Sequence, residues 1–341
     1  MKIENGLISV IMSNYNTPEK YLREAIESVL NQSYVNFEFI IVDDCSTDQS
    51  LSVVESYDDK RIVVLKNEVN MGITKSLNKA LKLAKGEFVA RMDADDICFS
   101  NRFVKQVNFL RENPNVIVCG TWAEFIGDWE KEHSKNESCR IIPDQETYRI
   151  HLLFGNYPNI IHPSAMFRHE MLLKNNIQYN EHYRFAQDYR MWVSCSNYGE
   201  CANVTEILLK YRIHGKAVSS DKKVLQHECT LGIIQEQLNK LDIKLVEKNE
   251  NIHVNLLFER QRYDLKYKKW IKYIIKQNKK YHVYNEKKLK NILWKKWAEI
   301  TYFGIRETDN YFLRIKILLK MPLIYMGKLF EIRTERIKSS G

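Results

Sequence analysis

The sequence predicts an α/β protein in which parallel strands alternate with helices. Short apolar runs, such as residues 7–12 and 37–42, have the length and near-continuous apolar character of buried parallel strands. Between them, apolar residues recur at helical spacing, as in residues 22–30. With 341 residues, of which 44% are hydrophobic and 28% charged, the chain has an ordinary globular composition and can bury a full core.

The first strand, residues 7–12, ends at Ser13-Asn14-Tyr15-Asn16. Thr17 is expected to cap the following helix, with Pro18 at its first helical position. Residues 37–42 then predict a second strand, which completes a βαβ unit of the usual right-handed sense. The apolar face of the intervening helix consists of Leu22, Ala25, Ile26, Val29 and Leu30.

Two further strands continue this pattern. The second strand ends at Asp43-Asp44, and residues 62–65 predict the third strand. Residues 73–84 predict a helix, and residues 87–90 a fourth strand. The fourth strand runs directly into Arg91-Met92-Asp93-Ala94-Asp95-Asp96.

Polar side chains therefore gather at the carboxyl ends of the predicted strands, where open α/β sheets bind ligands. Alternate side chains of an extended backbone face the same way, so Asp93 and Asp95 are expected to point together. Two adjacent carboxylates repel each other unless a proton or a cation lies between them, and oxygen ligands suit Mg²⁺ or Mn²⁺. The sequence predicts a metal site that holds a diphosphate, or else a loop in which one Asp caps the next helix.

Several protein classes are disfavoured. No glycine-rich phosphate-binding loop follows the first strand, which argues against dinucleotide oxidoreductases and P-loop enzymes. The seven cysteines are scattered without a Cys-x-x-Cys pair, which argues against a zinc site or disulfide framework and favours a reducing compartment. We expect no signal peptide and no membrane-spanning segment.

Four motifs in this order resemble the family 2 glycosyltransferases, in particular the bacterial O-antigen and capsular polysaccharide enzymes, over the first two thirds of the chain. Ser13 occupies a position that is often proline in the family, and Cys45 occupies one that is usually glycine. The resemblance implies the GT-A fold, a Rossmann-like mixed sheet flanked by helices, and an inverting transfer from a nucleotide-sugar donor with Mn²⁺ or Mg²⁺ as cofactor. The motifs are residues 9–16, 42–48, 70–73 and 91–96.

By the same resemblance, Asp43 and Asp44 would hold the nucleobase, although Asp44 could instead be a carboxylate that stabilises a helix N-terminus. Lys75 could equally be a solvated helix residue. The full donor-binding set is Asn14, Tyr15, Asn16, Asp43, Asp44, Asn70, Lys75, Arg91, Asp93 and Ala94. The implied metal ligands are Asp93, Asp95 and His214.

The acceptor half contains the predicted catalytic base. Asp188 follows Gln187, which replaces the first acid of the family's Glu-Asp motif. One base suffices because a metal neutralises the leaving diphosphate, so only the acceptor hydroxyl must lose a proton. His162, Gln187 and Arg212 are the expected acceptor or phosphate contacts, although His162 could equally be a core histidine. Residues 213–223 are expected to close over the donor.

The chain turns helical and basic towards its end. Residues 260–341 hold 22 Lys and Arg against 7 Asp and Glu, a balance of +15 in a chain of net charge +9. Lysines interleaved with Tyr and Trp favour an interfacial membrane arm, and the alternative is a packed helical subdomain with a solvated basic face. Residues 311–330 are apolar but carry Arg314, Lys316 and Lys320, so they could lie on a membrane but not cross it. No nucleic-acid module accompanies the arm.

Together these observations predict a catalytic domain over residues 1–220, with a nucleotide-sugar half (1–100) and an acceptor half (101–220). Residues 221–341 form the predicted basic extension. The predicted reaction moves a hexose from a UDP-sugar to a glycan on a polyprenyl diphosphate, at the cytoplasmic face of the inner membrane. The alternatives are a soluble or protein acceptor, and a non-catalytic scaffold that has kept the fold.

Overall fold

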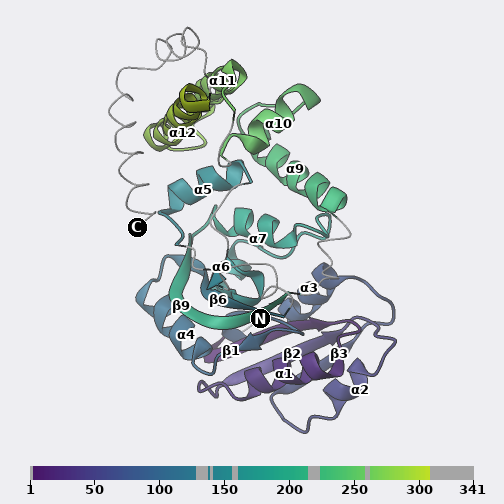
Figure 1. Cartoon of the computed structure of the whole chain (residues 1–341). Helices are drawn as coiled ribbons and strands as arrows, with labels where there is room; N and C mark the ends of the chain where they lie inside the picture. Colours follow the sequence, from purple (N-terminus) through teal and green to yellow (C-terminus); the bar gives the residue numbers. More distant parts are fainter. Residues whose placement is uncertain are drawn as a thin grey trace. The chain divides into compact units, whose positions relative to one another are not determined.

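The computed structural model describes residues 3–127, 137–138, 141–155, 160–213, 223–257 and 262–307 (Figure 1). The chain forms two compact units, which we call unit 1 (residues 1–145 and 158–230) and unit 2 (residues 146–157 and 231–341). The predicted domain boundary at residue 220 stays a prediction.

A mixed nine-stranded sheet forms the centre of unit 1, and its mixed character confirms the predicted fold class. Neighbouring strands along it are β3 (Ile62–Lys66), β2 (Phe37–Asp43), β1 (Glu4–Asn14), β4 (Gly86–Asp93), β8 (Met166–Arg168), β6 (Val116–Gly127), β9 (Glu200–Ile213) and β5 (Ile97–Cys98), while β7 (Glu137–Ser138) pairs with β6. The first four strands are parallel, whereas β8 and β5 run antiparallel to their neighbours.

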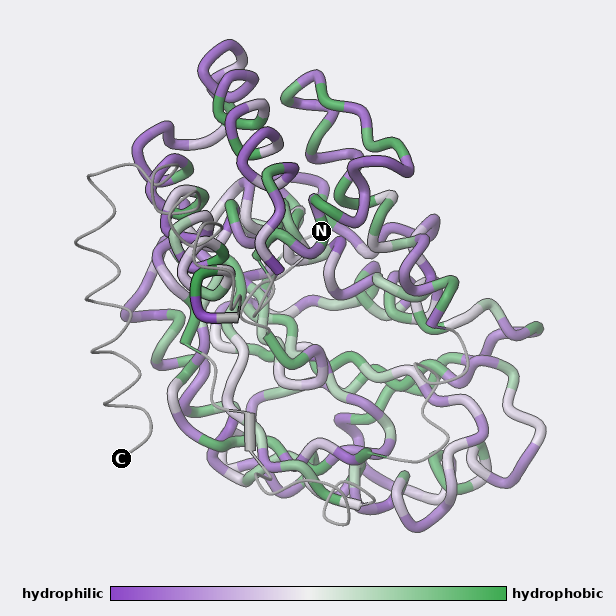
Figure 2. Tube along the Cα trace, turned by 45° about the horizontal axis from the view of Figure 1, so that its top comes forward, coloured by the Kyte–Doolittle hydropathy of each residue, from purple (hydrophilic) through white to green (hydrophobic). Residues whose placement is uncertain are grey.

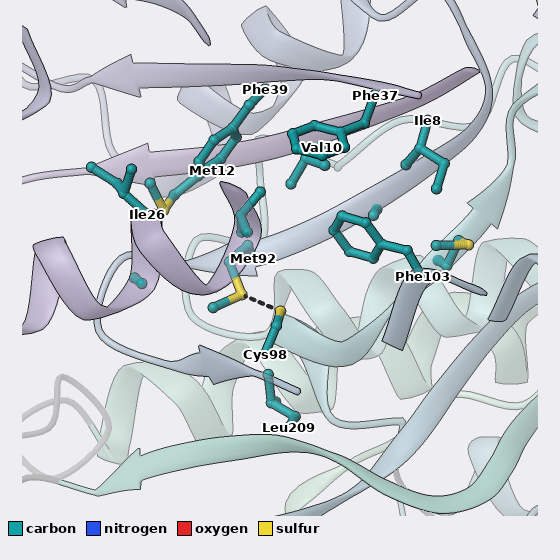
Figure 3. Packing of buried hydrophobic residues seen from close by; sticks show 14 of the residues in the cluster. Ile8, Val10, Met12, Ile26, Phe37, Phe39, Met92, Cys98, Phe103 and Leu209 are labelled. Carbon is teal, nitrogen blue, oxygen red and sulfur yellow. Dashed lines mark hydrogen bonds between the residues drawn. The ribbon is translucent and has the colours of Figure 1, made fainter. Parts of the chain in front are cut away.

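Apolar side chains of the sheet and its helices form the core of unit 1. Ile8 and Val10 of β1 pack with Phe37 and Phe39 of β2, and Ile26 of α1 joins the same cluster (Figure 3). The helices of unit 1 are α1 (Glu19–Leu30), α2 (Ser50–Glu55), α3 (Ile73–Leu83), α4 (Arg102–Glu112), α6 (His169–Lys174) and α7 (Gln187–Cys195), with a 3₁₀ turn η2 (His162–Ser164).

The predicted helix cap at Thr17 is wrong by one residue. Helix α1 begins at Glu19, and Pro18 occupies the capping position with φ −52° and ψ 133°, without any side-chain cap. Because that ψ value is extended rather than helical, Pro18 cannot be the first helical residue.

Unit 2 is helical. It contains most of α5 (Gln145–Leu153) and α9 (Lys223–Asn239), together with α10 (Glu247–Asn255), α11 (Leu265–Tyr281) and α12 (Glu286–Glu307). Hydrophobic and hydrophilic stretches alternate along the chain (Figure 2). In the part of the chain that the structure describes, no helix is both long and apolar enough to cross a membrane.

Some aromatic residues of the basic extension lie in the core of unit 2. Trp270, Tyr284 and Trp297 are buried, whereas Tyr273 and Tyr281 are exposed. Packing between the helices therefore uses three of these rings, and the membrane association of the basic extension stays a prediction. Residues 311–330 lie outside the described residues.

Candidate active site

Three carboxylates meet at the end of the central strand β4. One ligand atom from each of Asp93, Asp95 and Asp96 lies within 4.8 Å of the others. The expected proximity of Asp93 and Asp95 is correct, but the predicted reason is wrong. Strand β4 ends at Asp93, and Asp95 lies in the turn that follows, so the turn brings the carboxylates together rather than strand alternation. The same turn adds Asp96, whose side chain an extended strand would direct to the opposite face from that of Asp95.

Arg212 at the end of β9 holds this turn. Its backbone N–H donates to Asp96 Oδ1 (2.7 Å), and its Nε donates to the carbonyl of Asp95 (2.8 Å). Its Nη2 donates to Glu24 Oε2 (2.6 Å), and the guanidinium carbon lies 4.1 Å from the centre of the Tyr21 ring. Arg212 thus connects β9 and α1 to the acidic turn, and its role as an acceptor or phosphate contact stays a prediction.

The electrostatics of the cluster favour a bound cation. Asp96 is 1% exposed, and its Oδ2 has no hydrogen-bond partner within the described ranges. Burial raises the pKa of Asp96 well above its ordinary value, and the charges of Asp93 and Asp95 raise it further. Burial also raises the pKa of Asp93, against the opposing effect of Arg91. A divalent cation would remove this repulsion and satisfy the free oxygen, so the residues fit Mg²⁺ or Mn²⁺.

Arg91, on β4, contacts the acidic cluster through Asp93. It is 2% exposed and forms an ion pair with Asp93, while its Nε and Nη1 are buried without a partner among the described residues. Buried N–H donors normally find an acceptor, and those that do not are candidates for ligand contacts. Arg91 therefore retains hydrogen-bonding capacity beside the carboxylates.

His162 is a buried, neutral residue next to Arg91. Burial lowers its pKa well below the ordinary value, and the charge of Arg91 lowers it further. Its Nε2 lies 2.8 Å from the hydroxyl of Tyr179, and its ring meets that of Trp192 edge to face at 5.9 Å. This environment matches the alternative of a satisfied core histidine.

The nucleotide side of the predicted site is built on Asp43 and Asp44. Asp43 accepts from Asn14 Nδ2 (2.8 Å) and from the backbone and hydroxyl of Ser46 (3.0 and 2.6 Å), so its carboxylate joins the ends of β1 and β2. Asp44 accepts from the backbone N–H groups of Met71 (2.8 Å) and Gly72 (2.7 Å), and its Oδ1 also accepts from Asn67 (2.7 Å). Asp44 thus stabilises the loop that enters α3.

The other predicted donor-binding residues surround this framework. Asn16 has a positive φ of 50° and accepts from the backbone N–H of Thr47 (2.8 Å), which connects the end of β1 to the next loop. Ala94 is buried in the acidic turn. The exposed members of the set are Tyr15, Asn16, Asn70 and Lys75.

Asp188 lies in the first turn of α7, which begins at Gln187. Both side chains are half-buried, while Tyr189 and Trp192 anchor the helix in the core. Burial raises the pKa of Asp188, and hydrogen bonds from backbone N–H groups oppose this rise. The Asp188 charge contributes to the raised pKa of Asp93, so both carboxylates act within one electrostatic environment. His214 lies outside the described residues, as does most of the segment expected to close over the donor.

Comparisons with known proteins identify relatives of this chain. The family model described as Glycosyl transferase family 2 matches residues 9–174. An uncharacterized glycosyltransferase of Haemophilus influenzae is 36% identical over 70% of this chain and 77% of its own length. The Escherichia coli enzyme named UDP-Glc:alpha-D-GlcNAc-diphosphoundecaprenol beta-1,3-glucosyltransferase WfgD is 28% identical over 64% of this chain and 82% of its own.

Two solved structures share the fold. Staphylococcus aureus TarS 1-349 in complex with UDP-GlcNAc gives a TM-score of 0.57 at 22% identity, covering 90% of each chain. The mannosyltransferase PcManGT of Pyrobaculum calidifontis, in complex with GDP-Man and Mn²⁺, gives a TM-score of 0.52 at 14% identity, covering 94% of this chain and 82% of the other.

Proposed function

The chain belongs to glycosyl transferase family 2 with the GT-A fold, and from that premise we propose that it transfers a hexose from a UDP-sugar to a hydroxyl of a lipid-linked glycan, with inversion. The observation that carries the proposal is the acidic cluster at the end of β4, where the buried Asp96 Oδ2 has no partner in the described part of the chain. A buried carboxylate oxygen without a partner favours a positively charged ligand that oxygen atoms can coordinate, such as a divalent metal ion.

We propose that Asp93, Asp95 and Asp96 hold Mn²⁺ or Mg²⁺, with His214 as a further ligand. A divalent ion bound there neutralises the charge that develops on the departing diphosphate. The N–H groups at Arg91 Nε and Nη1, which have no partner among the described residues, would donate hydrogen bonds to sugar or phosphate oxygens of the nucleotide-sugar. Arg212 would keep the turn in place by holding Asp95 and Asp96.

The uridine preference is supported by the UDP-Glc in the name of WfgD and the UDP-GlcNAc in the TarS complex. Among the described residues, Asp44 Oδ2 accepts one hydrogen bond, from Gly72, and so would retain a lone pair for a base N–H. Asn14, Tyr15, Asn16, Asp43, Asn70, Lys75 and Ala94 complete the proposed donor site.

Asp188 is the proposed general base. As the acceptor oxygen forms its bond to the anomeric carbon, the bond from that carbon to the UDP oxygen breaks, and the hydroxyl proton passes to the Asp188 carboxylate. This single displacement inverts the anomeric centre. The burial-raised pKa suits the role, because a base is most effective when its pKa approaches the working pH. Gln187 is the proposed acceptor contact, whereas the bonded and buried environment of His162 favours its alternative role as a core histidine.

The proposed acceptor is a glycan on polyprenyl diphosphate in bacterial surface polysaccharide assembly, supported by the diphosphoundecaprenol in the name of WfgD. A peripheral position on the inner membrane, facing the cytoplasm, would follow. Helix α11 supports this with an exposed stripe that contains no acidic residue. The stripe, which we call the α11 lysines, consists of Lys266, Lys269, Lys272, Lys276, Lys279 and Lys280. Because Trp270, Tyr284 and Trp297 are buried, attraction to anionic headgroups would contribute more to binding than insertion of these rings.

A donor screen tests the catalytic proposal. Thermal-shift measurements with UDP-, GDP- and dTDP-sugars, each with and without Mn²⁺, should show stabilisation by UDP-sugars that depends on the metal. Stabilisation by GDP- or dTDP-sugars instead would show that the assignment of UDP-sugar as the donor is wrong. An absence of any shift, together with no UDP release, would favour a non-catalytic scaffold.

Sedimentation with anionic vesicles tests the membrane proposal. Changing Lys269, Lys272 and Lys276 to Gln should reduce binding by about fivefold per lysine at low salt. The matched control changes three exposed lysines of unit 1, Lys20, Lys60 and Lys82, by the same charge. Equal losses in both variants would show non-specific attraction, and full activity on a soluble glycan without vesicles would favour a soluble acceptor.

A further inference from the structure

Arg102, the first residue of α4, is a fully buried cation without a carboxylate partner in the described ranges. It is 0% exposed, and all of its hydrogen bonds go to neutral acceptors. Burying a guanidinium without a counter-ion costs several kcal/mol unless its donors are well satisfied. The groups that Arg102 holds therefore indicate why it is buried.

Those groups lie at both ends of the acidic segment. At the start, Arg102 Nη2 donates to the carbonyl of Arg91 (2.9 Å). At the end, Nη1 donates to Cys98 Sγ (3.0 Å), whose own thiol contacts Met92 Sδ at 3.3 Å (Figure 3). The Arg102 guanidinium thus connects Arg91, which precedes the Asp93–Asp96 segment, with Cys98, which follows it.

The sheet explains why the Arg91 carbonyl needs this donor. Strand β8 pairs with β4 only from Phe88 to Ala90. The next N–H, that of Arg91, donates to the Ala165 carbonyl (2.8 Å), so the Arg91 carbonyl faces the same side, beyond the end of β8. A buried carbonyl must be paired, and Arg102 supplies the donor.

Gln106, one helical turn further along α4, completes the arrangement. Its Oε1 accepts from Arg102 Nε (2.9 Å), and its Nε2 donates to the carbonyls of Cys119 (3.1 Å) and Ser164 (2.8 Å). The Arg102–Gln106 pair therefore fixes the end of β4 relative to β6 and η2, which a hydrophobic pair of the same size could not do.

We propose that Arg102 is a positioning residue for the acidic cluster: by bridging Arg91 and Cys98, it sets the geometry in which Asp93, Asp95 and Asp96 meet. The inference rests on the proposed metal site for its functional consequence, but not for its structural one. Residues that orient metal ligands from behind typically change metal affinity by 10- to 100-fold when they are altered.

The chain provides a matched control in Arg168. Its guanidinium also donates to main-chain carbonyls around α4, those of Leu110 (2.5 Å), Asn113 (3.3 Å) and Val116 (3.3 Å), but at the opposite end of the helix. Loss of Arg168 should therefore weaken the fold in the same manner without reaching the acidic turn.

The experiment compares Arg102→Met, Arg102→Lys and Arg168→Met. In metal-free protein, hydrogen exchange of residues 91–98 should accelerate in the Arg102 variants, whereas Arg168→Met should accelerate exchange around residues 110–116. By calorimetry, Arg102→Met should raise the Mn²⁺ dissociation constant about tenfold or more, and Arg168→Met less than about twofold. Arg102→Lys should be intermediate, because an ammonium cannot reproduce the planar fork.

Unchanged exchange of residues 91–98 in Arg102→Met, or equal losses of Mn²⁺ affinity in the Arg102 and Arg168 variants, would overturn the inference. If Arg102→Met does not fold, the same comparison between Arg102→Lys and Arg168→Lys decides. If the unaltered protein binds no Mn²⁺, the proposed metal site fails, while the exchange experiment still tests the positioning role by itself.

Discussion

His253 in unit 2 and Asp96 in unit 1 are both fully buried polar residues, but they differ in how many of their polar atoms have hydrogen-bond partners. His253 is 0% exposed, and both ring nitrogens have partners: Nε2 donates to the Leu153 carbonyl (2.9 Å), and Nδ1 accepts from Trp270 Nε1 (3.1 Å). The ring also stacks on Phe154 at 4.6 Å. Asp96 is 1% exposed, and one of its two carboxylate oxygens is unpaired within the described residues.

The difference separates a residue that serves folding from one held for a ligand. Burial lowers the pKa of His253 to about 4, so the imidazole stays neutral and fully bonded. Burial and two neighbouring carboxylates raise the pKa of Asp96, so its ionised form opposes folding. A charged group that costs stability and leaves an atom unbonded is a functional candidate, whereas a saturated neutral group is a structural one.

The largest expected effect concerns Asp188, the proposed general base, whose pKa is also raised by burial. Asp188→Asn should lower kcat by about 10³-fold, because the acceptor hydroxyl loses its proton acceptor. The melting temperature should stay the same or rise, since burial already disfavours the ionised carboxylate. Unchanged kcat, or a large loss of stability, would place Asp188 with His253 as a structural residue.

Next is His253→Leu, which should cost about 3 kcal/mol of unfolding free energy because it leaves the Leu153 carbonyl and the Trp270 N–H unpaired. Urea unfolding followed by tryptophan fluorescence measures the loss. The control, His282→Asn, changes an exposed histidine with a positive φ of 52°, which Asn tolerates, and should be nearly neutral. If the His253→Leu variant is folded at low temperature but has lost UDP-sugar binding, His253 has more than a structural role.

Asp96→Asn should separate stability from ligand binding. Metal affinity should fall by about 10- to 100-fold, since one carboxylate ligand becomes a neutral amide. The metal-free protein should melt about 2 °C or more higher, because the repulsion among the three aspartates is relieved. Calorimetry with Mn²⁺ and a melting curve in EDTA measure the two effects. A lower melting temperature in EDTA would show that the carboxylate serves the fold.

The smallest effect is a pH dependence with opposite signs in the two units. The folded pKa of His253, about 4, lies below its ordinary 6.5, so its contribution is complete above pH 6.5 and is lost as pH falls. At pH 5 the loss is about 2 kcal/mol relative to pH 8. Asp93 and Asp96 have raised pKa values, so metal-free unit 1 gains stability on acidification. His253→Leu should abolish the loss seen in unit 2, and an unchanged pH profile would contradict the assignment.

The sequence by itself determined the class of fold and the location of the acidic site. Strand and helix periodicity are local properties, so residues 7–12, 37–42, 62–65 and 87–90 were recognisable as strands from their own composition. The site followed because the carboxyl ends of parallel strands meet at one edge of a sheet. The motif at residues 91–96 could therefore be assigned before its geometry was known.

Tertiary structure alone decided how the site is built. Asp96 joins Asp93 and Asp95 because a turn, held by Arg212 from 116 residues away, replaces the extended strand. Arg102 reaches the carbonyl of Ala165 across 63 residues. The basic extension shows the same limit, since its periodicity could not tell a membrane-facing Trp297 from a buried one. Contacts between distant residues depend on how all elements pack at once, and no local pattern in the chain encodes them.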